Sequence, residues 1–200
     1  MSADACDLAS LAVRSYVALV HYPVYDRQRR IVSTSVTNLD IHDIARSCST
    51  YGLAQYFIIH PVGAQRQLVE RVLGYWDDGP GQDQNDFRRA ALSRVCVVQT
   101  TDEAVSAIAN THGQPPLVVG TTARSTAGCS SAAALRGRLS KEQRPLLLVM
   151  GTGWGLADDF MSTVDDVLEP IQGNSPYNHL SVRSATAILL DRLFAEENRT

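Results

Sequence analysis

Three glycines occupy alternate positions, Gly151, Gly153 and Gly155, directly after the apolar run Leu146–Met150. Glycine lets a backbone turn sharply and lets a ligand approach the main chain closely. The third glycine comes one residue too early for the dinucleotide fingerprint, and no Gly-Lys-Ser/Thr follows as in an ATP-binding loop. The segment therefore predicts a ligand-binding loop that is not built for NAD or ATP, with a simple strand-to-helix turn as the alternative.

Two further polar segments also follow apolar runs. Residues 120–124 (GTTAR) follow Val118 and Val119, and their small hydroxyl side chains and main-chain groups can hold a ligand. The second segment, residues 169–181, leads into a helix whose N-terminal end favours anions. The alternatives are a Ser/Thr-rich surface loop for the first and a helix-capping segment, with Asn178 or Ser181 as the cap, for the second.

Arg46 lies eight residues after Asn38, on a segment with helical apolar spacing. Arg46 leaves the apolar stripe and shares the opposite face with His42, four residues earlier. A guanidinium stays protonated at ordinary pH, so it can hold a phosphate or stabilise a developing negative charge but cannot accept a proton. The alternative is a solvated helix face.

Strands and helices alternate along the chain, which favours an α/β fold with a mostly parallel sheet and helices on both faces. The apolar patterns predict strands over 16–21, 31–37, 56–60, 95–99, 117–120, 146–150 and 167–171. They predict helices from a cap at Asp40 to about Gly52, and over 65–76, 87–93, 103–111 (capped by Asp102), 156–163 and 180–194. Such sheets bind ligands beyond the carboxyl ends of their strands, where the three polar segments lie.

Composition indicates one globular domain. The chain has 200 residues, of which 44% are hydrophobic and 20% charged, close to the globular average. We expect residues 1–12 to be a disordered tail and residues 13–200 to be a single domain. The apolar run Leu146–Met150 is far shorter than the ~18 residues of a membrane helix. The first residues have no basic region and include Asp4 and Asp7, so we expect no secretory signal and a cytoplasmic protein.

Charge and metal-ligand patterns narrow the possible partners. The net charge of −3 argues against a general nucleic-acid coat protein, although seventeen of the eighteen cations are arginines, which suit phosphate. A local basic patch could be formed by Arg27, Arg29, Arg30, Arg46, Arg88 and Arg89. The four cysteines form no CxxC pair and the five histidines no HExxH motif, so we expect no metal site.

Three segments together resemble, in order, the three motifs of SPOUT-class RNA methyltransferases. They are Asn38–Arg46, GTGWGL at 151–156, and LEPIQG at 168–173 with YNHLSVRSA at 177–185. The match is closest to a bacterial group of S-adenosylmethionine (SAM)-dependent RNA methyltransferases and runs from about Tyr16 to Phe194. The resemblance implies a trefoil knot in the C-terminal part, a SAM cofactor, and a homodimer whose active site lies at the subunit interface.

The resemblance also implies roles for single residues. Arg46 would activate the nucleophile or hold an RNA phosphate, with Asn38 in support. SAM would be held by Thr121, Thr122, Ala123, Gly151, Thr152, Gly153, Trp154, Gly155, Leu156, Pro170, Ile171, Asn178, Leu180 and Ser181. We expect Gly153→Val to abolish SAM binding without unfolding the protein, by filling the space that the ligand needs. We also expect the C-terminal helix to pair with a partner through Leu180, Ala185, Ile188, Leu189 and Leu193.

The predicted function is methyl transfer from SAM to a nucleotide of tRNA or rRNA. The segment 178–181 replaces the Ser-x-Asn pattern of the ribose-methylating branch, and no aspartate matches the base of the guanine-methylating branch. A ribose 2′-oxygen and a base nitrogen therefore both remain possible targets. One alternative is a non-catalytic RNA- or nucleotide-binding module on the same fold. Another, a metabolic enzyme with a Rossmann or flavodoxin-like sheet, is disfavoured by the missing dinucleotide fingerprint.

Overall fold

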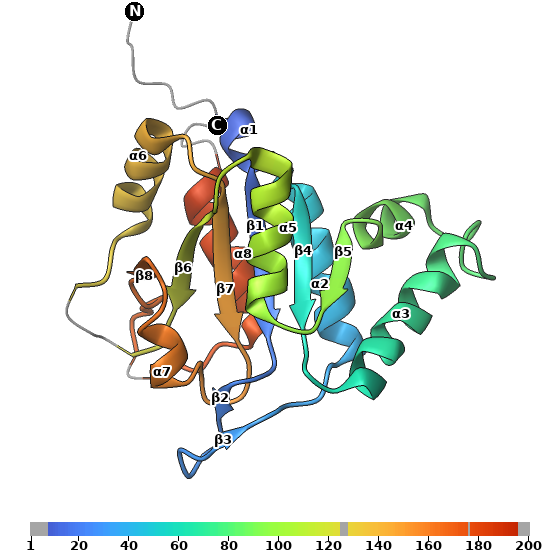
Figure 1. Cartoon of the computed structure of the whole chain (residues 1–200), viewed down its shortest axis with the longest axis horizontal. Coiled ribbons are helices and arrows are strands. Elements are labelled where there is room, and N and C mark those ends of the chain that lie inside the picture. Colours follow the sequence, from blue (N-terminus) through green and yellow to red (C-terminus); the bar gives the residue numbers. More distant parts are fainter. Residues whose placement is uncertain (1–7, 125–127, 176, 196–200) are drawn as a thin grey trace, which may run out of the picture.

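A six-stranded parallel sheet forms the centre of the molecule (Figure 1). The computed structural model describes residues 8–124, 128–175 and 177–195. The strand order is β5-β4-β1-β7-β6-β8, and each neighbouring pair is parallel. The strands are β1 Ser15–Val20, β4 Gln55–Ile59, β5 Val95–Val98, β6 Leu117–Thr121, β7 Leu146–Gly151 and β8 Asp166–Leu168. The expected α/β class with a mostly parallel sheet is confirmed.

Both faces of the sheet are covered by helices, because alternate residues of each strand point to opposite sides. Val17 and Leu19 of β1 belong to a core cluster shared with most of the helices, whereas Ala18 and Val20 belong to a second cluster. The first face carries α1 Leu8–Ala12, α2 Asn38–Thr50, α3 Gly63–Asp77, α4 Asp86–Leu92, α6 Ala132–Glu142 and α8 Val182–Phe194. The second face carries α5 Thr101–His112 and α7 Asp158–Met161 (Figure 1).

The predicted strand over residues 31–37 is wrong in extent and in partner. Only β3, Ile31–Val32, is extended in a ladder, and it pairs antiparallel with β2, Val24–Tyr25, in a separate two-stranded hairpin. Residues 33–37 join no sheet, because Thr34 is held by His21 and His60 at the ends of β1 and β4. The hairpin hangs below the carboxyl ends of the central strands in Figure 1.

Two helices lie where none was predicted. Helix α1 falls inside the expected disordered tail 1–12, because Leu11 and Ala12 are buried in the core; residues 1–7 lie outside the described residues. Helix α6 begins after the cap Ser131 and buries only Leu135 and Leu139, so its apolar stripe is weak. Within the described ranges, no helix combines the length and apolar character that crossing a membrane requires.

Helix starts differ from the expected caps by a few residues. Thr37, rather than Asp40, caps α2 by accepting a hydrogen bond from the Asp40 amide, and Thr100, rather than Asp102, caps α5. Helix α8 begins at Val182, two residues later than predicted, because the Ser181 hydroxyl accepts from the Ser184 amide. A serine or threonine in extended conformation is a favourable cap. Asp40 lies instead in the first turn, where it can form other contacts.

Strand β8 lies between two parts of the chain that are joined by a loop. Leu168 pairs with Thr121 at the end of β6 on one side and bridges to Ser130 on the other. The chain then continues from β8 to α8, which packs against α2 and α6. The trefoil knot that the resemblance implies stays a prediction.

The central strand β7 supplies a test of core packing. Leu148 is fully buried between β1 and β6. We expect Leu148→Ala to lower the free energy of unfolding by about 2–5 kcal/mol, since it removes buried methyl groups and leaves a cavity. Leu39→Ala, at a 59% exposed leucine on α2, should change it by less than about 0.5 kcal/mol. Urea unfolding followed by circular dichroism measures both, and equal effects would contradict this packing.

Candidate functional site

Three loops meet beyond the carboxyl ends of β6, β7 and β8. The Asn178 side-chain amide, in the loop before α8, donates to the Ala123 carbonyl oxygen after β6 at 2.8 Å. The rings of Trp154, after β7, and His179 meet edge to face with centroids 6.1 Å apart. Residues from all three predicted ligand segments therefore lie together, at the edge where parallel sheets bind ligands.

The glycine loop, residues 151–156, is held by the hairpin. Tyr25 of β2 donates its amide to the Gly155 carbonyl at 2.8 Å and accepts from the Trp154 amide at 2.9 Å. Leu156 bridges antiparallel to Val24. Thr152 is anchored on the other side, because its hydroxyl donates to the Val20 carbonyl at 3.1 Å. The loop is thus a rigid turn between β1 and the hairpin.

A side chain would meet different surroundings at Gly153 and at Gly155. Gly153 has φ +59°, and a Cβ there would lie 2.8 Å from the Tyr25 carbonyl oxygen. The expected reason for the effect of Gly153→Val is therefore wrong: the added side chain would push against the hairpin backbone rather than fill an open ligand space. Gly155 has φ +101°, and a Cβ there would meet nothing within 4 Å. Gly155 is the glycine that borders open space.

The other predicted cofactor residues divide into buried, turn-forming and exposed ones. Leu156 and Pro170 are buried, and Ile171 packs against the core. The Thr121 hydroxyl donates to the Val149 carbonyl at 2.9 Å, and that of Thr122 accepts from the Arg124 amide. Ser181 caps α8, whereas Leu180 is 46% exposed. Because most of these side chains are buried or bonded within the chain, the groups that can still face a ligand are mainly main-chain groups and the side chains of Trp154 and Asn178.

The two predicted catalytic residues do not lie together. Asn38 is the first residue of α2 and Arg46 lies eight residues further along, which is about 12 Å along a helix axis. Arg46 is exposed in a shallow hollow between α2 and α8, beside Tyr51 and Ala187. Within the described residues its side chain has no hydrogen bond or ion pair. Within one described chain, Arg46 therefore contacts neither Asn38 nor the three loops.

A buried ion pair connects α2 with the start of α8, and sequence reasoning missed it. The Asp40 carboxylate, 8% exposed, accepts from the Arg183 guanidinium at 2.8 Å and from the Thr37 hydroxyl at 2.6 Å. Arg183 also lies 3.4 Å from Asp43. Charge-assisted bonds of this kind orient both partners. The pair fixes the segment that carries Asn178 and Ser181 relative to the first motif.

A second missed cluster lies under the glycine loop. His21 and His60 directly follow β1 and β4, are both buried, and stack with ring centroids 5.2 Å apart. Thr34 contacts both. The signal in the sequence was a histidine, soon followed by proline, at the end of two apolar strands. In the part of the chain that the structure describes, no group of three or more His, Cys, Asp or Glu residues could hold a metal.

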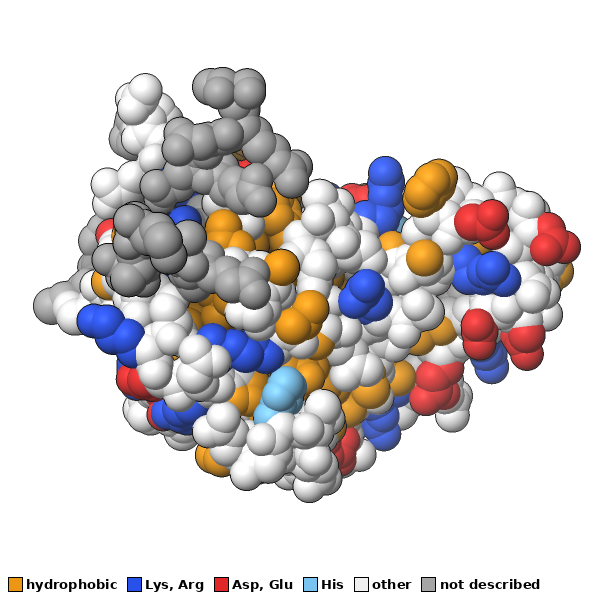
Figure 2. All heavy atoms as spheres, turned by 90° about the horizontal axis from the view of Figure 1, so that it is seen from above, with side chains coloured by type: hydrophobic (Ala, Val, Ile, Leu, Met, Phe, Trp, Pro, Cys, Tyr) orange, Lys and Arg blue, Asp and Glu red, His pale blue; other side chains and the backbone are white. Residues whose placement is uncertain are grey.

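The six arginines considered as a basic patch are divided among three places in the fold, with Arg46 on α2. Arg27, Arg29 and Arg30 lie on the hairpin, whereas Arg88 and Arg89 lie on α4, beside the edge strand β5 (Figure 1). Several are paired: Arg29 with Asp158, Arg30 with Asp26, and Arg89 with Asp86. On the face at the amino ends of the strands, Figure 2 shows basic side chains scattered among neutral and acidic ones. The single-patch expectation is therefore wrong.

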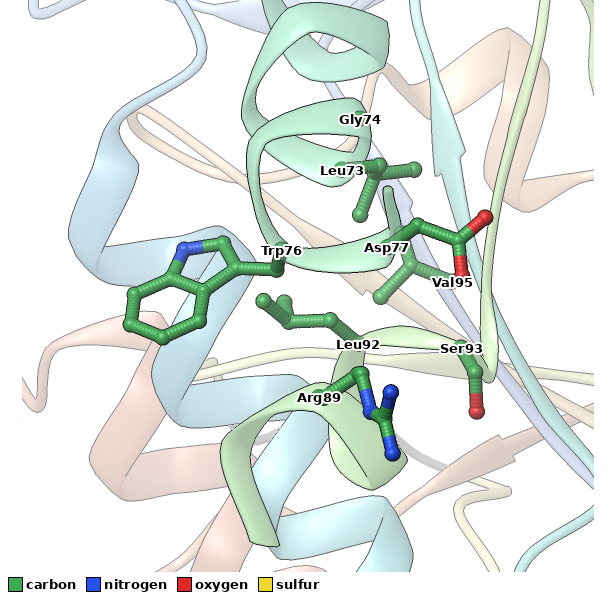
Figure 3. Close-up of a pocket in the computed structure, with 8 residues that line it drawn as sticks. All are labelled: Leu73, Gly74, Trp76, Asp77, Arg89, Leu92, Ser93 and Val95. Carbon is green, nitrogen blue, oxygen red and sulfur yellow. The ribbon is translucent and has the colours of Figure 1, made fainter. Parts of the chain in front are cut away.

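The hollow shown in Figure 3 lies far from the three loops. Its volume is about 230 Å³, and its walls come from α3, α4 and β5, with Leu73 and Leu92 flanked by Asp77 and Arg89. Strand β5 is the edge of the sheet opposite β8. This hollow shares no residue with the predicted motifs, so the loop cluster remains the candidate site.

A family model described as SAM-dependent RNA methyltransferase matches residues 14–195. The chain belongs to this family. Membership confirms the SAM cofactor and the RNA methyltransferase function expected from the sequence, and the non-catalytic module is not favoured.

Individual relatives and solved structures agree with this assignment. An uncharacterized protein of Aquifex aeolicus is 42% identical over 180 residues, covering 90% of this chain and 88% of that protein. A tRNA (guanine-N(1)-)-methyltransferase of Nitratidesulfovibrio vulgaris is 46% identical over 181 residues, but the match spans only 42% of its length. The SpoU methyltransferase AviRb from Streptomyces viridochromogenes, solved with AdoMet, has a TM-score of 0.55 at 13% identity, covering 90% of this chain and 58% of AviRb. The SPOUT-like fold is thereby confirmed.

The Asn178 contact provides a test of the loop cluster. We expect Asn178→Ala to weaken S-adenosylhomocysteine binding by about fivefold, because losing one hydrogen bond between two loops costs roughly 1 kcal/mol. Asn174→Ala removes an exposed amide from the same loop and should leave the affinity unchanged. Isothermal titration calorimetry of both variants measures the difference. Equal affinities for the two variants would show that the contact does not shape the site.

Proposed function

We propose that the three-loop cluster is the active site, where this chain transfers the methyl group of SAM to an RNA nucleotide. The observation that carries the proposal is the joining of the three polar loops after β6, β7 and β8 by the Asn178–Ala123 hydrogen bond and the Trp154–His179 ring contact. Because the RNA substrates of such enzymes lie in the cytoplasm, we expect the protein to act there.

The residues at this edge suit a SAM site. Gly155 borders open space, and the indole of Trp154 is 52% exposed. We assign SAM binding to Thr121–Ala123, to Gly151–Leu156 and to the segment from Pro170 to Ser181, mainly through main-chain groups. When bound, SAM supplies an electrophilic methyl group on a sulfonium. The chain then needs only to place the RNA nucleophile in line with that methyl group and to exclude water.

The surface around the cluster suits an unpaired RNA segment. Trp154, Tyr177 and His179 form an exposed aromatic cluster, with the Tyr177 and His179 ring centroids 5.5 Å apart. Bases stack on exposed aromatic rings whatever their sequence. Arg27 on the hairpin and Arg124 after β6 are exposed and have no ion pair within the described residues. They are therefore free to bind RNA phosphates.

A ribose oxygen and a base nitrogen make different demands on the site, because only some RNA groups must lose a proton before they accept the methyl group. Arg46 cannot be the base, because its guanidinium stays protonated. A ribose 2′-oxygen needs a base or a nearby cation, whereas a base nitrogen with a free lone pair needs only orientation. The guanine-N1 activity is named for the Nitratidesulfovibrio vulgaris relative, and this chain matches less than half of that protein.

Binding and transfer assays test the proposal directly. We expect calorimetry to show binding of SAM and S-adenosylhomocysteine but not of ATP or NAD. We expect the protein to transfer a labelled methyl group to RNA from cells that lack it, and mass mapping of nuclease fragments then identifies the nucleotide and atom. Absence of heat with both sulfur compounds, at about 0.1 mM protein to reveal weak sites, would overturn the cofactor assignment. Binding of SAM and RNA without transfer would favour the non-catalytic module.

We further propose that the active form is a homodimer. Helix α8 offers less apolar surface to a partner than the sequence suggested, because Leu189 and Leu193 are buried by their own chain and Leu180 precedes the helix. The support comes instead from Arg46, which lies exposed between α2 and α8 without contact to the loops of its own chain. A second copy docked on this face would let Arg46 complete the site of its partner.

Solution mass tests the dimer. We expect static light scattering at micromolar concentration to report about 44 kDa, twice the 21.8 kDa of one chain. Arg46→Glu, which reverses a charge on the proposed interface, should shift the mass toward that of one chain at low salt. A wild-type mass near 22 kDa over this concentration range would contradict the shared site.

Arg46 separates catalysis from binding. We expect Arg46→Ala to keep S-adenosylhomocysteine affinity but to lower methyl transfer by about 10²-fold or more, as for a group that acts on the transition state. Arg46→Lys should recover only part of the rate, because an ammonium lacks the planar fork. Single-turnover assays with excess enzyme measure the step. Unchanged transfer in Arg46→Ala would assign the residue to a solvated helix face.

A further inference from the structure

A chain of hydrogen bonds connects the buried histidines to the glycine loop. The His21 Nδ1 lies 3.0 Å from the Thr34 hydroxyl, which lies 2.5 Å from the Thr152 hydroxyl. The Thr152 hydroxyl in turn contacts the Val20 carbonyl oxygen at 3.1 Å. Thr152 is the second residue of the glycine loop, so the chain ends inside the SAM site.

Only one placement of protons satisfies all three contacts. A carbonyl oxygen only accepts, so the single hydroxyl proton of Thr152 points to Val20. The proton of Thr34 must then point to Thr152, which leaves the Thr34 oxygen to accept from His21. His21 therefore carries a proton on Nδ1. Burial, together with neighbouring His60, lowers its pKa to about 4, which agrees with a neutral ring at physiological pH.

Thr34 is held on its main chain as well. Its amide donates to the His21 carbonyl at 3.0 Å, and its carbonyl accepts from His60 Nε2 at 2.9 Å. The direction of the last bond is fixed, since His60 Nδ1 accepts from the Val62 amide at 3.1 Å and so has no proton. Thr34 thus makes four hydrogen bonds although it belongs to no helix or strand. Such anchoring of an irregular segment indicates a positional role.

We propose that Thr34, oriented by His21 and His60, is a positioning residue for the SAM site. Its hydroxyl holds Thr152 and thereby sets the first half of the glycine loop, while Tyr25 of the hairpin holds Trp154 and Gly155 in the second half. The inference rests on the proposed function of this loop. In this proposal, the segment between β1 and α2 fixes the conformation of the glycine loop through the contact between Thr34 and Thr152.

Substitutions at the two ends of the chain test this role. Thr34→Val keeps the shape but removes the hydroxyl, and Thr34→Ser keeps the hydroxyl. We expect Thr34→Val to raise the Kd for S-adenosylhomocysteine and the KM for SAM about tenfold, the effect of one lost buried hydrogen bond, with the KM for RNA unchanged. Thr34→Ser should stay within about twofold of the wild type. His21→Phe keeps a ring against His60 but loses the donor, and should show the same split.

Coupling and a matched control separate positioning from general destabilisation. The double variant His21→Phe/Thr34→Val should bind no more weakly than Thr34→Val alone, because both changes act through one contact. Thr186→Val removes another buried threonine hydroxyl, in α8, and should leave cofactor affinity unchanged. Wild-type affinity in a folded Thr34→Val, or equal losses in Thr34→Val and Thr186→Val, would overturn the proposal.

A measurement without ligand distinguishes this proposal from the proposed function. Amide hydrogen exchange over residues 152–155 should be faster in Thr34→Val than in the wild type, and restored in Thr34→Ser, because the loop loses one anchor. If the wild-type protein binds no S-adenosylhomocysteine, the cofactor assignment fails while faster exchange still supports the positioning role. Equal exchange in the wild type and Thr34→Val would overturn that role whatever the protein binds.

Discussion

The insertion of β7 between β1 and β6 is the constraint on which the site depends. The strand Leu146–Gly151 pairs in parallel with both neighbours, and its first five residues are buried. A parallel strand buried on both faces must be apolar throughout, as this one is. Its position brings the glycine loop to the carboxyl edge between the segment that follows β1 and the loops that follow β6 and β8. The Thr34–Thr152 and Trp154–His179 contacts each span one of these junctions.

The loop cluster combines a rigid base with an exposed rim. Below, Thr152, Leu156 and Pro170 are buried or bonded to neighbouring segments. Above, Trp154, Tyr177 and Leu180 expose large apolar surface. A stable monomer has little reason to expose several such side chains together, and exposed apolar groups of this kind mark binding surfaces. This separation supports our proposal that the cofactor binds the rigid part and that the RNA binds the rim.

The charged side chains of α2 differ in burial and in pairing along the helix. At its start, Asp40 is buried and paired with Arg183, and this pair anchors the start of α8. Eight residues after Asn38, Arg46 faces solvent beside α8. A charge that is paired and buried holds structure, whereas an exposed arginine without an ion pair can bind a phosphate or a second chain. One helix thus carries a buried, paired charge in its first turn and an exposed one less than two turns later.

The sequence by itself determined the α/β class, six of the strands, and the three polar loops of the candidate site, because burial on both faces and glycine spacing are local patterns. Strand order, the hairpin at residues 24–32, helix α6 and the Thr34 anchors depended on tertiary contacts. Residues 31–37 alternate like a strand, yet bonds from His21 and His60 remove most of them from any ladder. Gly153 faces the Tyr25 carbonyl and Gly155 faces open space, although the two glycines look alike in the sequence. Only the folded chain, which brings β2 against the loop after β7, makes them different.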